Sequence, residues 1–240
     1  MRRSELDTQQ YGAAVDPPYL FPDYVGTRLR APSGPLLVLP ATLTELTAPV
    51  FGESDVRPGD ADLTRQHDGE PLGERVIVAG RVLGADGRPL RRQLVEIWQA
   101  NAAGRYRHEV DTHAAPIDPN FSGAGRALTD DDGWYRFTTI KPGAYPWGNH
   151  HNAWRPAHIH FSLFGRAFTQ RLVTQMYFPD DPLFFQDPMY NSVADRDPKA
   201  AQRMISAFDY DATEDHWALA YRWDIVLRGE EATPTEEPHA

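Results

Sequence analysis

Short runs of alternating apolar and polar residues, separated by turn-forming pairs, fill the sequence from Glu74 to Gly229. Alternation at every second residue predicts β-strands with one buried face. The strand candidates are ERVIVAGRVLG, QLVEIWQAN, WYRFTTI, RPAHIHFSLFG, RAFTQRLVTQMYF and WALAYRWDIVLRG. About six antiparallel strands at this spacing predict an all-β fold with an antiparallel β-sandwich core.

Two Asp-Gly pairs predict how consecutive strands are joined. Asp86-Gly87 follows the run at 74–84, and Asp132-Gly133 precedes the run at 134–140. Because Asp-Gly suits the tight turns of hairpins, we expect each pair to connect neighbouring antiparallel strands. The final run is expected to bury one face, made of Leu219, Tyr221, Trp223, Ile225 and Leu227.

The sequence divides into three parts by composition. Residues 1–70 are rich in proline, glycine and acidic residues, which predicts an extended N-terminal arm with few regular elements. Residues 71–229 form the predicted β-sandwich. Residues 230–240 are acidic and have few apolar side chains to bury, which predicts a disordered tail.

One short helix is predicted within residues 197–210. Asp197 is suited to the N-cap and Pro198 to the first turn, while Met204 and Phe208 have the spacing of one helix face. We expect this helix to pack at an edge of the sandwich.

Charge and composition limit the partners. The 240 residues carry a net charge of −10, which argues against nucleic acid or an anionic membrane as the main partner. No run approaches the roughly 20 apolar residues of a membrane span. We therefore expect a cytoplasmic protein that binds a small molecule or another protein. The chain lacks cysteine, so any metal must be bound through nitrogen and oxygen.

A His-x-His pair lies in the run HIHFSLF. His158 and His160 share one face of the predicted strand, while Ile159, Phe161 and Leu163 share the core face. Two neighbouring imidazoles can bind one Zn, Cu, Fe or Ni ion, although two histidines on a wet strand face would give the same pattern. Further ligand candidates by type are His108, His113, His150, His151 and the carboxylates of Asp130 to Asp132.

Two tyrosines lie directly after predicted strands, among Gly, Pro and Arg. They are Tyr106 in GRYRH and Tyr145 in GAYPW. A phenol has a reference pKa near 10, so it binds a metal only where a strong Lewis acid stabilises the phenolate. Phenolate oxygens together with imidazoles suit ferric iron better than zinc. Ordinary tyrosines at loop edges are common, and the residues alone leave both interpretations open.

Several segments resemble the intradiol ring-cleavage dioxygenases, and within that family the β subunits of the protocatechuate 3,4-dioxygenases. The similar segments are GERVIVAGRV, LVEIWQANAAGRYRHEVD, DPNFSGAGRALTDDDGWYRFTTIKPGAYPW, WRPAHIHF, TQMYFPDDP and ALAYRWDIVLRG. They cover most of residues 73–229, and PDY at 22–24 resembles the arm of those β subunits.

The resemblance implies a non-haem Fe(III) ion bound by Tyr106, Tyr145, His158 and His160. It also implies a partner, the α subunit of the same enzyme, which has the same fold but lacks the intact ligand set. In this arrangement residues 71–229 are the catalytic domain with the iron site, and the arm of residues 1–70 makes subunit contacts. The implied reaction is cleavage of protocatechuate by O2 to 3-carboxy-cis,cis-muconate.

The resemblance further implies roles for residues around the metal. Tyr145 is the ligand that substrate displaces and that takes up a proton, Arg155 is the cation near the developing negative charge, and Gln175 offers its amide to substrate or peroxide. Trp147 is a wall of the substrate pocket, and Tyr24 donates to the substrate carboxylate. His150 and His151 match no position in the family pattern.

Other functions fit parts of the sequence. Catechol or hydroxyquinol could replace protocatechuate in the same chemistry, although residues 1–70 lack the helical periodicity of the catechol enzymes' N-terminal region. A non-catalytic transthyretin-like sandwich would lack a metal set. A zinc hydrolase would need a third histidine or a carboxylate beside His158 and His160.

Overall fold

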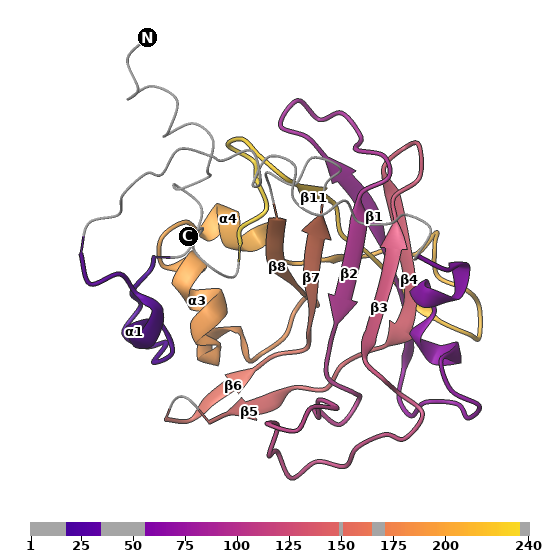
Figure 1. The fold of residues 1–240 in the computed structure, drawn as a ribbon, viewed down its shortest axis with the longest axis horizontal. Helices are drawn as coiled ribbons and strands as arrows, with labels where there is room; N and C mark the ends of the chain where they lie inside the picture. The colour runs from indigo at the N-terminus through magenta and orange to yellow at the C-terminus, as the bar shows by residue number, and fades with distance from the viewer. Residues whose placement is uncertain (1–17, 35–55, 149–150, 165–170, 236–240) are drawn as a thin grey trace.

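Most of the regular structure is β-sheet. The structure is a computed structural model that describes residues 18–34, 56–148, 151–164 and 171–235. Two sheets pack face to face around one apolar core, with a few short helices beside them (Figure 1). This confirms the predicted all-β fold. Within the described residues, no helix has the length and apolar character needed to cross a membrane.

The first sheet is built around β1 (Arg75–Leu83). β4 (Trp134–Ile140) pairs with it antiparallel, whereas β10 (Leu219–Arg222) and β11 (Ile225–Val226) pair with it parallel, one after the other. β9 (Ala207–Phe208) adds to β10. This sheet is therefore mixed, and the prediction of a purely antiparallel sandwich is wrong here. The reason is that the C-terminal strands return to β1 from far along the chain, a crossover that allows parallel pairing.

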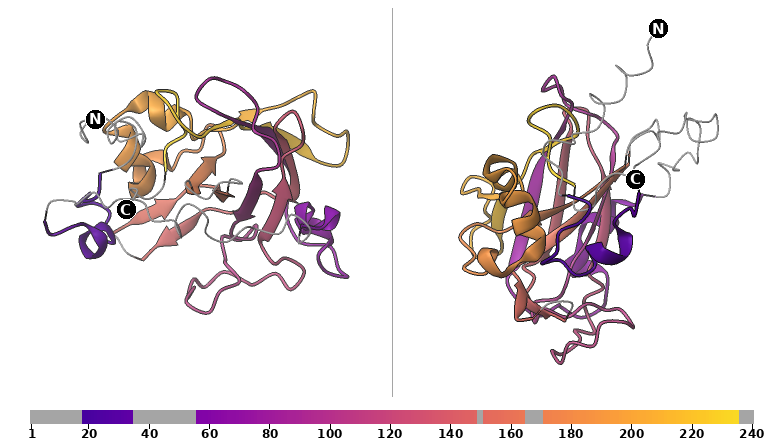
Figure 2. Two further views of the ribbon diagram at one scale, coloured as in Figure 1. Left: turned by 45° about the horizontal axis from the view of Figure 1, so that its top comes forward. Right: turned by 90° about the vertical axis from the view of Figure 1, so that its left-hand side faces the viewer.

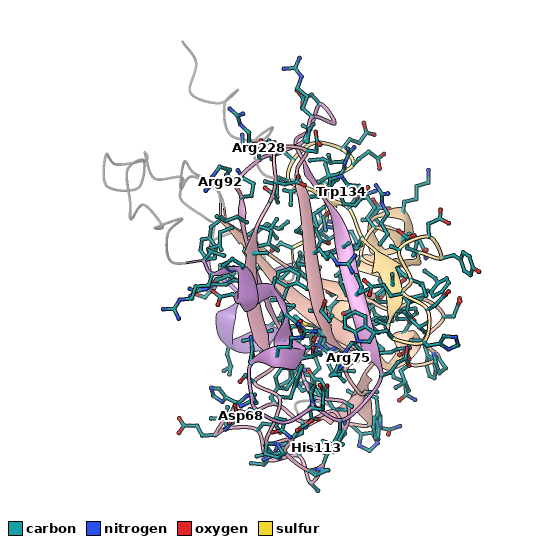
Figure 3. The ribbon with its side chains drawn as sticks, turned by 90° about the vertical axis from the view of Figure 1, so that its right-hand side faces the viewer. Asp68, Arg75, Arg92, His113, Trp134 and Arg228 are labelled. Atoms are coloured by element: carbon teal, nitrogen blue, oxygen red, sulfur yellow. The ribbon has the colours of Figure 1, made fainter. Side chains whose placement is uncertain are left out.

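Figure 3 views the first sheet from outside. Trp134 and Arg75 are labelled there toward opposite ends of the antiparallel pair, in agreement with the register Arg81 to Trp134 and Arg75 to Ile140. The Trp134 ring lies between two cations, with the Arg81 guanidinium carbon 5.2 Å and that of Arg222 4.6 Å from its centroid. These contacts cover part of the outer face of the sheet.

The second sheet carries the His-x-His pair. Its strands lie in the order β3 (Ala124–Leu128), β2 (Leu94–Trp98), β7 (His158–Phe164) and β8 (Arg171–Tyr177), and every neighbouring pair is antiparallel. Because β7 is an inner strand, both of its edges are held by backbone hydrogen bonds. The positions of its side chains are therefore fixed.

Both Asp-Gly turns form, but neither makes a hairpin between neighbouring strands. The Gly87 amide donates to Gly84 O at 3.0 Å, and the Gly133 amide donates to Asp130 O at 3.1 Å. In each case the strand before the turn lies in one sheet and the strand after it lies in the other. The predicted hairpins are therefore wrong. The two strands that flank each turn lie in different sheets, and they bury their apolar faces against each other across the core.

The alternation of β7 predicts its core face correctly. Ile159, Phe161 and Leu163 lie in the main core between the sheets. The final run is less regular: it breaks between β10 and β11, and Leu219 is 39% exposed, so its predicted burial is wrong. Tyr221, Trp223 and Ile225 are buried as predicted.

The helical prediction is only partly right. α4 (Pro198–Gln202) begins where predicted but ends early, and Phe208 lies in β9 with 48% of its surface exposed. A second helix, α3 (Pro188–Ala194), was not predicted, although Asp187 caps it just as Asp197 caps α4. Both helices lie beside β8 (Figure 1) and pack there in a small apolar cluster.

The described parts of the predicted arm contain short helical turns. They are α1 (Thr27–Arg30), η2 (Pro58–Ala61) and η3 (Leu63–Arg65), and a further turn, η4 (Phe184–Gln186), precedes α3. Leu63 is fully buried in the main core, so this part of the chain packs on the sandwich. The domain boundary at residue 70 stays a prediction.

Residues 230–235 differ from the predicted disordered tail, and residues 236–240 of that prediction lie outside the described residues. Thr235 Oγ1 donates to the carbonyl of Val173 at 2.8 Å, and Thr174 Oγ1 donates to the carbonyl of Pro234 at 2.6 Å. The threonine and proline residues of this segment therefore satisfy polar groups on β8. The sequence did not predict these contacts, because they are hydrogen bonds and the prediction of a disordered tail rested on the lack of apolar side chains.

Candidate metal centre

The two histidines of β7 project from the same face of the second sheet. Their ring centroids are 4.9 Å apart. His158 is buried and His160 is half-buried. The indole of Trp98, the cross-strand neighbour of His160 on β2, stacks on the His160 ring with centroids 4.8 Å apart and planes 4° from parallel. This stacking fixes the plane of the His160 imidazole.

Hydrogen bonding orients the His158 ring as a metal ligand requires. Its Nδ1 lies 2.7 Å from the carbonyl oxygen of Pro156, so Nδ1 carries the proton and donates. Burial, helped by the nearby Arg155 and His160, holds the pKa of His158 well below its usual value. The neutral imidazole therefore presents the lone pair of Nε2 on the other side of the ring.

The two tyrosines bring their phenol oxygens to these imidazoles. Tyr106 lies in the loop after β2, and its oxygen is 3.1 Å from His160 Nε2. Tyr145 begins β5 (Tyr145–Trp147), which pairs with β6 (Ala153–Arg155), and its oxygen is 3.4 Å from His158 Nε2. The two phenol rings meet edge to face, with centroids 5.6 Å apart. Two oxygens and two nitrogens from four side chains are thus brought together.

This donor set fits ferric iron. Burial raises the pKa of the Tyr145 phenol, against the lowering effect of the Arg155 charge, so the phenolate needs a strong Lewis acid beside it. Hard phenolate oxygens completed by neutral imidazoles suit Fe(III). In the described part of the chain, no group of three or more His, Asp or Glu side chains could bind a metal. The third ligand expected of a zinc hydrolase is therefore absent from the described residues around His158 and His160.

Glycine allows the two tyrosine-bearing segments to approach closely. Gly104 has a φ of +78°, and a Cβ added there would overlap the carbonyl oxygen of Ala144, next to Tyr145. A Cβ added at Gly143 would likewise overlap the carbonyl oxygen of Ala102. The loop that carries Tyr106 and the strand that carries Tyr145 are therefore in direct backbone contact.

We expect Gly104→Ala to weaken both metal binding and stability, because the new methyl group forces the segments of Tyr106 and Tyr145 apart. Gly87→Ala is the matched control, since Gly87 has a φ of +74° but open space around the added Cβ. The control should cost about 1–2 kcal/mol of stability from backbone strain alone. Denaturant unfolding and iron analysis of both variants test this, and equal iron contents would contradict the role of the close approach.

Arg155 lies beside the four donors. It is the strand partner of Tyr145, it is 3% exposed, and its guanidinium lies 5.2 Å from the centroid of the Trp147 ring. Burial favours loss of its proton, but the carboxylate of Asp187 and the neighbouring tyrosines outweigh this, so the pKa of Arg155 is raised well above its ordinary value. The site therefore contains a permanent buried cation.

Gln175 belongs to the same group of contacts. It is fully buried, is the cross-strand neighbour of His160, and accepts a hydrogen bond from Nη2 of Arg155 through Oε1. Its amide nitrogen lies 2.9 Å from the sulfur of Met189. The structure thus holds Gln175 next to both Arg155 and the histidine strand.

The arm reaches the site through Tyr24. Its ring lies 4.7 Å from that of Trp147, centroid to centroid. Figures 1 and 2 show α1, which follows Tyr24, beside the β5–β6 pair. Trp147 therefore lies between the arm and Arg155.

The other candidates stay away from this centre. His108 is exposed, and His113 lies on the outer loops labelled in Figure 3. His151 is exposed in the turn between β5 and β6, and His150 lies outside the described residues. Asp130 accepts from the amides of Asp132 and Trp134, which explains the acidic cluster as a turn.

Three residues of the site were missed in the sequence: Trp98, Tyr177 and Asp187. Tyr177 could have been found, because it is two residues after Gln175 on a strand and so shares its face. Asp187 carries the same Asp-Pro signal that predicted α4. Trp98 could not have been found, because its contact with His160 depends on the pairing of β2 with β7.

Comparison with known proteins agrees with this geometry. Residues 46–229 match the family model described as Dioxygenase, and residues 13–42 match the model described as Protocatechuate 3,4-dioxygenase beta subunit N terminal. The chain is 58% identical to the protocatechuate 3,4-dioxygenase beta chain of Burkholderia cepacia over 92% of this chain and 93% of that protein.

More distant relatives extend the family. The alpha chain of protocatechuate 3,4-dioxygenase from Pseudomonas putida is 31% identical over 67% of this chain and 75% of its own length. The solved structure of hydroxyquinol 1,2-dioxygenase from Pseudomonas putida DLL-E4 superposes with a TM-score of 0.51 at 25% identity, covering 69% of this chain and 58% of that one. These matches set aside the non-catalytic sandwich. The chain belongs to the intradiol ring-cleavage dioxygenase family, and within it to the group of protocatechuate 3,4-dioxygenase β chains.

Proposed function

We propose that this chain is the iron-bearing β chain of an enzyme that cleaves protocatechuate with O2 to 3-carboxy-cis,cis-muconate. The main support is that four potential ligand side chains come together in two Tyr–His pairs. The Tyr106 oxygen lies 3.1 Å from His160 Nε2, and the Tyr145 oxygen lies 3.4 Å from His158 Nε2. We propose these four side chains as the ligands of Fe(III). The choice of substrate is supported by the 58% identical relative and by the arm model that includes Tyr24.

Bound ferric iron would supply the Lewis acidity and electron-accepting power that make a chelated catechol ring reactive toward dioxygen. The protein's own groups prepare the substrate. The Tyr145 phenolate is the base that takes a proton from a ring hydroxyl, and the pKa of its phenol, raised by burial, favours holding that proton. Arg155 stabilises the negative charge that grows on the ring.

The remaining residues orient the ring. We propose that Trp147 forms one wall of the substrate pocket, since its ring lies between the Arg155 guanidinium and Tyr24. Tyr24 then donates its hydroxyl to the substrate carboxylate, which catechol and hydroxyquinol lack. Gln175 offers its amide to substrate from beside Arg155.

We also propose that the chain works with an α chain. The support is that both a β chain and an α chain of protocatechuate 3,4-dioxygenase are among its relatives. The exposed apolar side chains around the arm, Leu20, Val25 and Leu29, offer surface for such a contact.

Oxygen uptake with and without an α chain tests the proposed function. The iron-loaded complex should consume O2 with protocatechuate far faster than with catechol or hydroxyquinol, and the purified protein should show a visible tyrosinate-to-iron absorption band. Iron-loaded protein without that band would remove the proposed ligand set. Faster uptake with catechol would keep the chemistry and change the substrate.

A further inference from the structure

The strongest unexplained feature near the site is a fully buried carboxylate, Asp187. It is 0% exposed and lies just before α3, about thirty residues from Arg155 along the chain. Its Oδ1 is 3.2 Å from Nε of Arg155, and its Oδ2 is 3.2 Å from Nη2. A buried carboxylate with such a partner is stable only because the pair neutralises itself.

Asp187 is itself held by two further bonds. Its Oδ1 accepts from the amide of Met189 at 2.9 Å, which caps α3, and its Oδ2 accepts from the Tyr177 hydroxyl at 2.9 Å. The carboxylate is thus anchored to a helix on one side and to β8 on the other. These bonds fix the position of the Asp187 carboxylate, and the carboxylate in turn limits the movement of the Arg155 guanidinium.

The anchoring determines how the Arg155 guanidinium is held. The hydrogen bonds that Arg155 donates to Gln175, Tyr177 and Asp187 leave from Nη2. Its Nε faces Oδ1 of the same carboxylate. Asp187 and its neighbours therefore hold one edge of the guanidinium, while Arg155 remains the strand partner of Tyr145 and lies beside Trp147.

We propose that Asp187 is a positioning residue: it fixes the Arg155 guanidinium by one edge, so that the positive charge stays beside Tyr145 and the reacting ring, and it couples the start of α3 to the active site. This inference rests on the proposed function. Tyr177 assists by binding both partners, at 2.9 Å from Asp187 and 3.1 Å from Arg155.

The chain contains a matched control. Asp197 caps α4 as Asp187 caps α3, and each is followed by proline. Asp197 accepts from the amides of Lys199 and Ala200, and no ion pair joins it to an arginine among the described residues. Asparagine is as good an N-cap as aspartate. Asp187→Asn and Asp197→Asn therefore both preserve a cap, and only the first removes the countercharge of Arg155.

The test measures kcat and KM of the iron-loaded complex with protocatechuate for Asp187→Asn, Asp197→Asn, Arg155→Ala and the double variant Arg155→Ala/Asp187→Asn. We expect Asp187→Asn to lower kcat at least about 10-fold with little change in KM, because a misaligned cation loses its effect in the transition state. Asp197→Asn should match the parent. The double variant should have the kcat of Arg155→Ala alone, because Asp187 acts only through Arg155.

Two outcomes distinguish failure of the positioning role from failure of the proposed function. If Arg155→Ala lowers kcat but Asp187→Asn does not, or if the two losses multiply in the double variant, the positioning role is wrong and the proposed function stands. If Arg155→Ala leaves kcat unchanged, the assignment of Arg155 in the proposed function is wrong instead. Should Asp187→Asn fold poorly, Tyr177→Phe removes one anchor without unpairing a charge, and it should lower kcat in the same direction.

Discussion

His158→Ala is expected to abolish most iron binding. The variant removes a neutral donor whose Nε2 is aimed at Tyr145 by the bond from Nδ1 to the carbonyl of Pro156. Changes to groups that merely orient a ligand already cost about 10–100-fold in metal affinity, so loss of a ligand should cost at least that. Iron per chain, measured after purification and after reloading with excess iron, is the readout.

Ser162→Ala provides the control for His158→Ala. Ser162 lies on the same face of β7, is equally buried and is outside the donor set. It should keep its iron, and thermal unfolding of the metal-free forms will show how much of any loss comes from the cavity at position 158. Full iron in His158→Ala would mean that His158 is not a ligand.

Arg155→Ala is expected to slow turnover about 10²–10³-fold while iron stays bound, since removal of one preorganised charge partner of a developing anion has effects of this size. The reason is positional: Arg155 is paired with Tyr145 across β5 and β6, so its charge is fixed beside a proposed metal ligand. Stopped-flow measurement of single turnovers and separate measurement of substrate affinity are required.

Arg155→Lys is the companion variant, because it keeps the charge and loses the planar shape that bridges Gln175 and Asp187. It should recover only part of the rate. A variant with normal turnover but weak substrate binding would make Arg155 a substrate anchor. Arg155→Ala also leaves Asp187 buried without its countercharge, so lowered stability is expected alongside the kinetic effect.

Local patterns in the sequence were sufficient for some elements. The alternation in HIHFSLF determined which side chains of β7 enter the core, because apolar residues at every second position leave only one way to bury them. Asp-Gly likewise predicted where the chain turns. It could not predict which strands the turns join, because pairing is decided by the packing of two sheets that local turn chemistry does not encode.

In the site, too, local features were predicted and contacts between distant segments were not. Tyr106, Tyr145, His158 and His160 were identified by chemical type and by family resemblance, and the structure brings them together. Their supports were not identified. Trp98 reaches His160 through a cross-strand register, and Asp187 reaches Arg155 from the start of α3, a helix that was not predicted. Contacts between distant segments depend on the finished fold.

The parallel pairing of β1 with β10 and β11 has a consequence for biosynthesis. The Arg81 amide bonds to Asp224, 143 residues later, and the edge of β1 next to it is completed only by residues from 219 onward. During translation this edge stays open until residues 219–226 have left the ribosome. A chain that stops before Leu219 is therefore an unfinished sheet with an exposed strand edge, prone to aggregation and to recognition by chaperones.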